Sequence, residues 1–132
     1  PTAAEMATLR TFVNALKADH ATLLGAISTG IKGDVEVLHN GVIRWVRLFA
    51  DAVGSIVVDI WKDSYANFPP TVADTLIPAP GTKPTLSSQT NSEDTTLTAW
   101  TVKLTKGDIL RFNVDSATTV KRVLVSLGIE RT

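Results

Sequence analysis

The hydrophobic pattern of the chain changes its period near Gly33, and this change constrains the fold more than any other feature. Before Gly33, apolar residues recur every three or four positions, which is the spacing of one face of a helix. After it, apolar and polar residues alternate, as they do in half-buried strands. The sequence therefore predicts a mainly β protein, with an N-terminal coiled-coil helix over residues 1–30 and an antiparallel β-sandwich head domain over residues 34–132.

The helical segment carries an unbroken heptad spacing. Thr2 followed by Glu5 fits a capping box, and Gly30 fits a C-terminal stop. Apolar residues beside the seam widen the stripe, which favours three strands. We therefore expect a parallel homotrimeric coiled coil, and the alternative is one amphipathic helix packed on its own domain. The trimer seam is predicted to consist of Met6, Leu9, Val13, Leu16, His20, Leu23 and Ile27.

One position of the predicted seam is a histidine, His20. A single polar residue at such a position lowers stability but fixes the register and the number of strands. Three imidazoles at the axis of a trimer would alternatively offer Zn²⁺ three nitrogen ligands. The sequence favours the partly hydrated, register-setting histidine, and it predicts no metal and no other cofactor.

Strand signals recur through the rest of the chain. Asn40-Gly41 lies between two alternating runs, which is the strongest short hairpin signal. Residues 62–95 hold five of the six prolines and are predicted to be a long polar excursion. Strands at this spacing without helices between them are typical of a jelly-roll-like sandwich. Further strands are predicted over residues 42–49, 54–61, 96–104, 108–114 and 120–129.

Charge and composition exclude several classes of function. Lys plus Arg and Asp plus Glu number 13 each, so the chain has no basic excess for binding nucleic acid or anionic lipid. It has no cysteine, which excludes disulfides, thiolate metal sites and a cysteine nucleophile. No apolar run approaches the roughly 20 residues of a membrane span. We therefore predict neither a nucleic acid nor a membrane as partner.

No catalytic motif is found in the sequence. It contains no Gly-rich phosphate loop, no HExxH or GxSxG motif and no EF-hand loop. Paired carboxylates are what a glycosidase requires, but the candidates here occupy turn positions and solvated strand faces. We predict that the protein is not an enzyme, and an enzyme acting on cell-wall or capsule sugar is the alternative. The carboxylates in question are Asp51, Asp59, Asp63 and Asp74.

Three aromatic residues cluster in the stretch WKDSYANFPP: Trp61, Tyr65 and Phe68. Aromatic faces beside carboxylate and amide groups often bind sugars, so these residues are a candidate glycan contact. The alternative is that Tyr65 and Phe68 fasten the long excursion onto the β domain.

Several stretches of the sequence resemble a module of tailed-bacteriophage virion proteins. They are GSIVVDIWKDSYANFPPTVADT, KPTLSS, DTTLTAWT, KGDILRFNVDSATTVKRVLVSL and the closing IERT, and the resemblance covers residues 41–132. In that group, the module often ends longer tail-fibre or minor structural polypeptides. The resemblance implies a virion structural protein and brings no catalytic residues with it.

The short N-terminal segment lies outside this resemblance, which implies a small accessory protein rather than a long tail fibre. We therefore expect a non-enzymatic, homotrimeric capsid decoration (cement) or head-fibre protein that assembles in the host cytoplasm. Its partners would be its own copies and the major capsid protein or another virion protein. The alternative is a tail-fibre or receptor-binding protein that recognises a host surface glycan.

Overall fold

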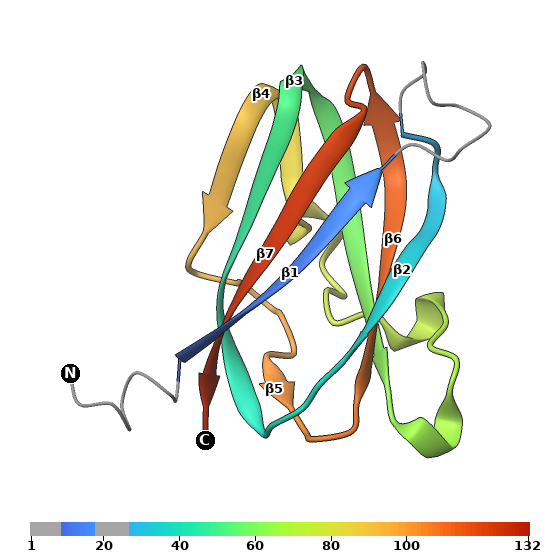
Figure 1. The fold of residues 1–132 in the computed structure, drawn as a ribbon, viewed down its shortest axis with the longest axis vertical. Helices are drawn as coiled ribbons and strands as arrows, with labels where there is room; N and C mark the ends of the chain where they lie inside the picture. Colours follow the sequence, from blue (N-terminus) through green and yellow to red (C-terminus); the bar gives the residue numbers. More distant parts are fainter. Residues whose placement is uncertain (1–8, 18–26) are drawn as a thin grey trace.

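Seven antiparallel strands dominate the computed structural model of the protein, which describes residues 9–17 and 27–132 (Figure 1). The strands pair in the order β1-β7-β3-β6-β2, and β4 and β5 add to β3 beside this path. The predicted mainly β, antiparallel architecture is confirmed, and the finer jelly-roll-like sandwich stays a prediction. The strands are β1 (Leu9–Lys17), β2 (Gly30–Glu36), β3 (Gly41–Asp63), β4 (Thr85–Asp94), β5 (Lys103–Leu104), β6 (Ile109–Thr118) and β7 (Arg122–Arg131).

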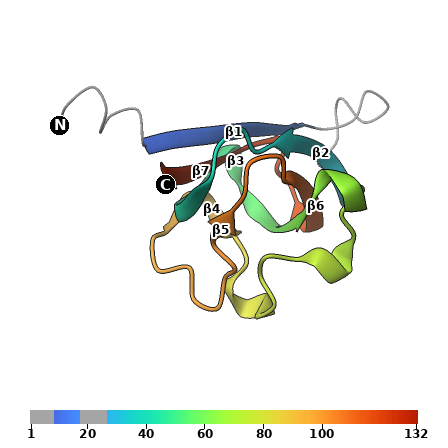
Figure 2. The ribbon, with the colours of Figure 1, turned by 90° about the horizontal axis from the view of Figure 1, so that it is seen from below.

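The longest strand, β3, connects the two halves of the sheet. Residues 41–50 pair with β7, and residues 55–63 pair with β6. Gly54 lies at the change of partner, where a Cβ atom would come within 2.6 Å of Val120 Cγ1. Because only glycine permits this close approach, β3 passes from one partner to the other without ending. The predicted strand over 54–61 is therefore part of β3, and Figure 2 shows how the sheet curls around its interior.

Alternating residues of the central strands fill the interior of the curled sheet. Removing their apolar surface from water, at about 25 cal/mol per Å², is the main stabilising contribution to the fold. On three strands, the apolar residues that alternate toward the interior are buried. They are Ile56, Val58 and Ile60 on β3, Leu110, Phe112 and Val114 on β6, and Val123, Val125, Leu127 and Ile129 on β7.

The prediction of an N-terminal helix is wrong over residues 9–17, the part of this segment that the structure describes. Residues 9–17 form β1, which pairs with β7 from Leu9↔Glu130 to Lys17↔Arg122. The coiled coil is wrong over the same residues. The physical reason is that β1 supplies hydrogen-bond partners to the edge of β7 that faces away from β3. Such tertiary pairing overrides a weak local preference for helix.

The residues of the predicted trimer seam therefore do not lie together in one helix where the structure describes them. Ile27 is 2% exposed in the core of its own domain, and its N–H donates to Val120 O at 2.8 Å. At Ile27, therefore, the apolar stripe is covered by the same chain. Both interpretations of His20 stay predictions, because this residue lies outside the described part. Of the other seam residues, Leu9, Val13 and Leu16 lie in β1, and Met6 and Leu23 lie outside the described residues.

The hairpin predicted at Asn40-Gly41 is also wrong. β2 pairs with β6 and not with β3, so β6 lies between the two strands that this turn joins. Asn40 O instead accepts a hydrogen bond from Thr132 N at 3.0 Å. At Gly41, a Cβ atom would lie 2.8 Å from Glu130 O. The Asn-Gly pair therefore allows the chain to pass close to the end of β7 rather than forming a tight two-residue turn.

Two further segments differ from the sequence prediction. The polar run Thr85–Asp94, predicted to belong mostly to the excursion, forms the ten-residue strand β4. Of the strand predicted over 96–104, only β5 is extended, because Leu97 and Ala99 have positive φ angles of 52° and 64°. Leu97 is nevertheless buried, as is Trp100. Apolar alternation here reflects a loop that is anchored in the core.

Candidate functional site

The first part of the loop over residues 64–84 lies beside β2 and β6 (Figures 1 and 2), and its later residues Leu76 and Ile77 are buried in the core. The loop contains three short 3-10 turns: η2 (Tyr65–Asn67), η3 (Val72–Asp74) and η4 (Pro80–Thr82). Because these turns are short, the loop is held by its side chains and by single backbone contacts, not by regular secondary structure of its own.

None of the helices in the described residues is long and apolar enough to span a membrane.

A buried carboxylate on β3, Asp59, anchors this loop. Asp59 is 1% exposed, and its side chain points away from the core that its neighbours Val58 and Ile60 fill. Its Oδ1 accepts hydrogen bonds from Ile60 N and from the Thr75 hydroxyl. A buried carboxylate is stable only when such donors replace its lost water. The loop is thus fastened to the sheet at Thr75.

Lys83 completes this buried arrangement, which we call the Asp59 network. Its Nζ lies 3.4 Å from Asp59 Oδ2 and 2.6 Å from Asp115 Oδ2. The hydrogen bond to Asp115, followed by the charge of Asp59, raises the pKa of Lys83 above its ordinary value. The ammonium group thereby joins the end of the loop to both β3 and β6.

Trp61 belongs to this network and is not brought to the surface with the other two predicted glycan contacts. It is 9% exposed, and its indole Nε1 donates to Asp59 Oδ2 at 2.9 Å. The side chain contributes to the seat of the loop, so its ring offers little area to a ligand.

Tyr65 and Phe68, by contrast, are exposed at one pocket of about 550 Å³, which we call the Tyr65 pocket. Tyr65 is 84% exposed and Phe68 is 50% exposed. The alternative that these two rings fasten the loop stays a prediction. The residues that line the pocket are Glu36, Tyr65, Ala66, Phe68 and Ile109.

The register of the sheet explains how distant residues meet at this pocket. Glu36 on β2 lies directly opposite Ile109 on β6, and Ile109 lies opposite Asp63 at the end of β3. Directly opposite residues of antiparallel strands point to the same face of the sheet. Glu36 and Ile109 therefore form the floor, and η2, which follows β3 almost at once, brings Tyr65 beside it.

Arg111 supports the pocket from the next row of the sheet. Its Nε and Nη2 donate to the two carboxylate oxygens of Asp34 at 2.7 and 2.8 Å, which raises the pKa of Arg111. Its guanidinium also lies over the Phe68 ring, 5.3 Å from the centroid, within the range of a cation–π contact. A bidentate pair fixes the guanidinium plane, so the Phe68 ring has a fixed support.

The polar groups at the mouth of the pocket have no bonding partner within the described residues. In the described part of the chain, neither the Glu36 carboxylate nor the Tyr65 hydroxyl makes a hydrogen bond or an ion pair. Most other strand carboxylates are engaged, as Glu93 is by Arg47 and Glu130 by Arg44. Glu36 and Arg111 are not predicted from the sequence as site residues, because their position follows from the pairing of β2 with β6.

The four carboxylates considered for catalysis serve separate local contacts. Asp63 accepts from Ser64 N, and Asp74 accepts from Thr71 N, each at 2.8 Å. Asp51 accepts from Arg122 N and Lys121 N, which lowers the pKa of Asp51. None of these hydrogen bonds joins two of the four. Among the described residues, no group of three or more His, Asp or Glu side chains is placed to hold a metal ion.

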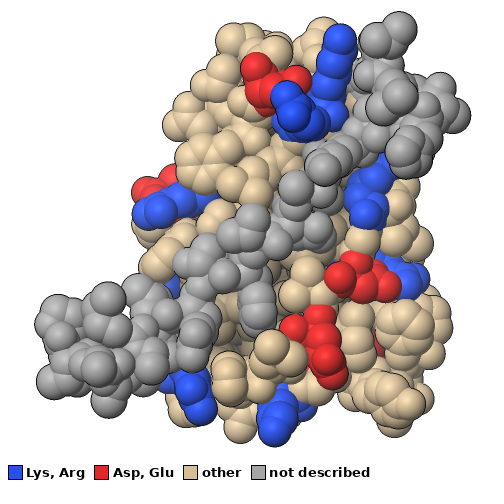
Figure 3. All heavy atoms as spheres, viewed as in Figure 1, with Lys and Arg blue, Asp and Glu red and all other residues tan. Residues whose placement is uncertain are grey.

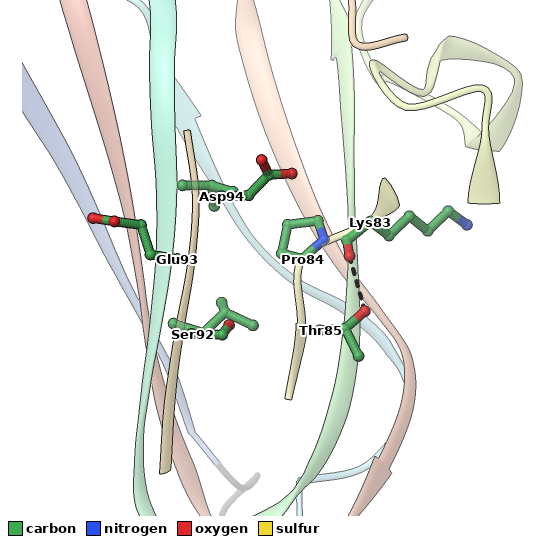
Figure 4. Close-up of a pocket in the computed structure, with 8 residues that line it drawn as sticks. Lys83, Pro84, Thr85, Ser92, Glu93 and Asp94 are labelled. Atoms are coloured by element: carbon green, nitrogen blue, oxygen red, sulfur yellow. Dashed lines mark hydrogen bonds between the residues drawn. The ribbon is translucent and has the colours of Figure 1, made fainter. Parts of the chain in front are cut away.

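A second pocket of about 250 Å³ lies between β3 and β4 (Figure 4). Its charged groups have structural partners. Lys83 belongs to the Asp59 network, Glu93 pairs with Arg47, and Asp94 Oδ1 accepts from Thr96 N and Leu97 N. Figure 4 shows the side chains of Lys83 and Glu93 pointing away from the pocket on opposite sides. This pocket therefore offers a ligand little free chemistry.

A strip of large side chains lies on the outer face of β3, and we call Trp45, Arg47 and Phe49 the β3 strip. The Arg47 guanidinium lies 5.0 Å from the centroid of the Trp45 ring, and Phe49 is 43% exposed. Trp45 packs over Gly128, where a Cβ atom would come within 2.0 Å of the indole. Tryptophan, arginine and phenylalanine are enriched in protein interfaces, so this strip is a candidate contact surface.

Charges of both signs are interspersed over the described part of the face in Figure 3.

Comparison with known proteins does not assign the chain to a family, because no family model and no curated protein matches it. The likeness to phage virion modules therefore stays a prediction from the sequence.

Proposed function

We propose that the protein is a non-enzymatic structural protein of a tailed-bacteriophage virion, and in particular a capsid decoration or head-fibre protein. The resemblance over residues 41–132 motivates this proposal. It begins at the first residue of β3 and includes every strand from β3 to β7, so the resemblance coincides with a continuous part of one sheet. A domain of this kind is a rigid unit that can be displayed on a particle.

The β3 strip is the observation in the structure that favours a structural role. Its Trp, Arg and Phe side chains lie together on one outer face. All three types are enriched in protein interfaces, and Trp and Arg are among those that contribute most of the binding energy. We assign this strip to contact with the major capsid protein, with another virion protein or with a second copy of the chain.

Homotrimer formation belongs to the same proposal, but the coiled coil over residues 9–17 no longer supports it. Light scattering gives the number of copies directly, and a trimer has three times the 14.1 kDa of one chain. A monomer in solution and on the particle would contradict this part of the proposal.

Cryo-electron microscopy of whole particles tests the proposed location, with assembly in the host cytoplasm followed by attachment to the virion. We expect density for the domain at regular positions on the capsid. The double substitution Arg47→Ala and Phe49→Ala should reduce its occupancy at least tenfold, whereas Val72→Ala, an exposed change on the distant loop, should leave it unchanged. Particles that lack the protein altogether would contradict the proposal.

A second candidate function is recognition of a host surface glycan, as in a receptor-binding protein. The specific observation in its favour is the Tyr65 pocket, which keeps two aromatic rings exposed beside a free carboxylate. Binding of particles to host cells that is lost in Tyr65→Ala would support this function. Unchanged adsorption of the variant particles would contradict it.

A further inference from the structure

We infer that the Tyr65 pocket binds a neutral saccharide, with the Tyr65 ring as the stacking face and the Glu36 carboxylate as the acceptor for sugar hydroxyls. This inference rests on the second candidate function, because it names the class of ligand for that site. It extends the predicted glycan contact by adding Glu36, Ile109 and Arg111 and by removing Trp61 from the ligand surface.

The apolar part of the pocket has the chemistry that a sugar ring requires. An aromatic ring carries partial negative charge on its face, and this attracts the weakly positive C–H groups on one side of a pyranose. Tyr65 offers such a face at 84% exposure, and Phe68 and Ile109 line the same pocket. The volume of about 550 Å³ lies within the range of small-molecule sites and is sufficient for a short oligosaccharide.

The polar part of the pocket selects against charged ligands. The Glu36 carboxylate forms no ion pair within the described residues, so it repels an anionic sugar. A cationic ligand is disfavoured at the other wall, because the Arg111 guanidinium already occupies a face of Phe68. The remaining class is a neutral polyol, whose hydroxyl groups donate to Glu36.

The Phe68 wall of the pocket is also held in shape before a ligand arrives. Asp34 fixes Arg111, and Arg111 supports Phe68. The loop beyond Phe68 is fastened through Thr75 and Asp59. A site that is already ordered loses less conformational freedom on binding, which favours measurable affinity from a small contact area.

Saturation-transfer NMR on the purified full chain tests this inference. The probes are methyl glycosides of glucose, galactose, N-acetylglucosamine and N-acetylgalactosamine, together with choline and N-acetylneuraminate. We expect transfer to the ring protons of at least one neutral glycoside. Tyr65→Ala should abolish it, Glu36→Gln should weaken binding about tenfold, and Val72→Ala should leave it unchanged.

Tyr65→Leu is the matched variant that keeps apolar volume and removes the aromatic face, and it should lose binding as Tyr65→Ala does. The inference is overturned if no neutral glycoside shows transfer, if Tyr65→Leu binds as well as the wild type, or if choline or N-acetylneuraminate binds instead. Saccharide binding by the purified protein with unchanged host-cell adsorption in Tyr65→Ala would uphold this inference and contradict the receptor function.

Discussion

The loop over residues 64–84 contributes to two neighbouring regions on the outer face of the sheet, the Asp59 network and the Tyr65 pocket. In the network, a carboxylate that is 1% exposed has donors on both of its oxygens. In the pocket, the carboxylate of Glu36 has no partner within the described residues, and Tyr65 is 84% exposed. The contrast shows that one part of the loop fixes its position and another part presents free chemical groups.

The division has a physical basis. Buried polar groups stabilise a fold only when all of them are paired, so the network leaves nothing for a ligand to bind. Exposed groups contribute little to stability and are free to contact a ligand. We therefore expect substitutions in the network to change the free energy of unfolding, and substitutions in the pocket to change saccharide binding.

The largest effect on the free energy of unfolding is expected from Asp59→Ala. Removing this carboxylate leaves the Trp61 indole N–H, the Thr75 hydroxyl and the Lys83 ammonium without their shared partner. We expect a loss of about 3 kcal/mol in the free energy of unfolding, measured by urea denaturation. Asp59→Asn keeps the shape and one acceptor, so it should lose less. A loss below about 1 kcal/mol for Asp59→Ala would show that the carboxylate does not anchor the loop.

The second effect is a loss of stability at alkaline pH that depends on Lys83. Its pKa is raised in the folded protein by Asp115 and Asp59, so the folded state holds this proton more tightly than the unfolded state does. The resulting stabilisation is fully present below the ordinary value of 10.5 and is lost as the pH rises through the raised pKa. Thermal melts from pH 9 to pH 12 should therefore show a steeper decline for the wild type than for Lys83→Met. Parallel curves would contradict the assignment.

A smaller effect on stability is expected from Asp34→Asn, which removes the charged partner of Arg111. The pair is partly exposed, so the free energy of unfolding should change by less than about 1 kcal/mol. Saccharide binding should nevertheless weaken a few-fold, because Phe68 loses its fixed support. Arg44→Ala breaks an exposed ion pair elsewhere and serves as the control. Equal saccharide affinities for the two variants would show that Arg111 does not support the pocket.

The smallest effect on stability is expected from Tyr65→Ala. Because the side chain is 84% exposed, the free energy of unfolding should stay within about 0.5 kcal/mol of the wild type. The same variant should lose saccharide binding. A large loss of stability would instead mean that Tyr65 fastens the loop, which is the alternative that the sequence left open.

The sequence was informative where local pattern and final environment agree. Alternation over Leu110, Phe112 and Val114 predicts their burial, because a strand with one buried face leaves no other arrangement. Tyr65 and Phe68, which the sequence offered as a glycan contact, are exposed, and the contact itself stays a prediction.

The sequence does not predict which strands pair when they lie far apart along the chain. Residues 9–17 carry a helical spacing, yet they pair with β7, whose open edge is known only from the fold. The Asn40-Gly41 signal predicts a hairpin, but β6 is inserted between β2 and β3. Glu36 is not predicted as a site residue for the same reason, because its neighbours Ile109 and Phe68 come from other parts of the chain.

A titration of the ¹⁵N-labelled protein with the neutral glycoside that binds, followed through its amide resonances, tests directly whether the Tyr65 pocket is the saccharide site. We expect shifts confined to Glu36, to residues 65–68 and to Ile109, with the resonances of β4 unchanged. Shifts centred on β4 or on the β3 strip, or no shifts at saturating glycoside, would contradict this assignment.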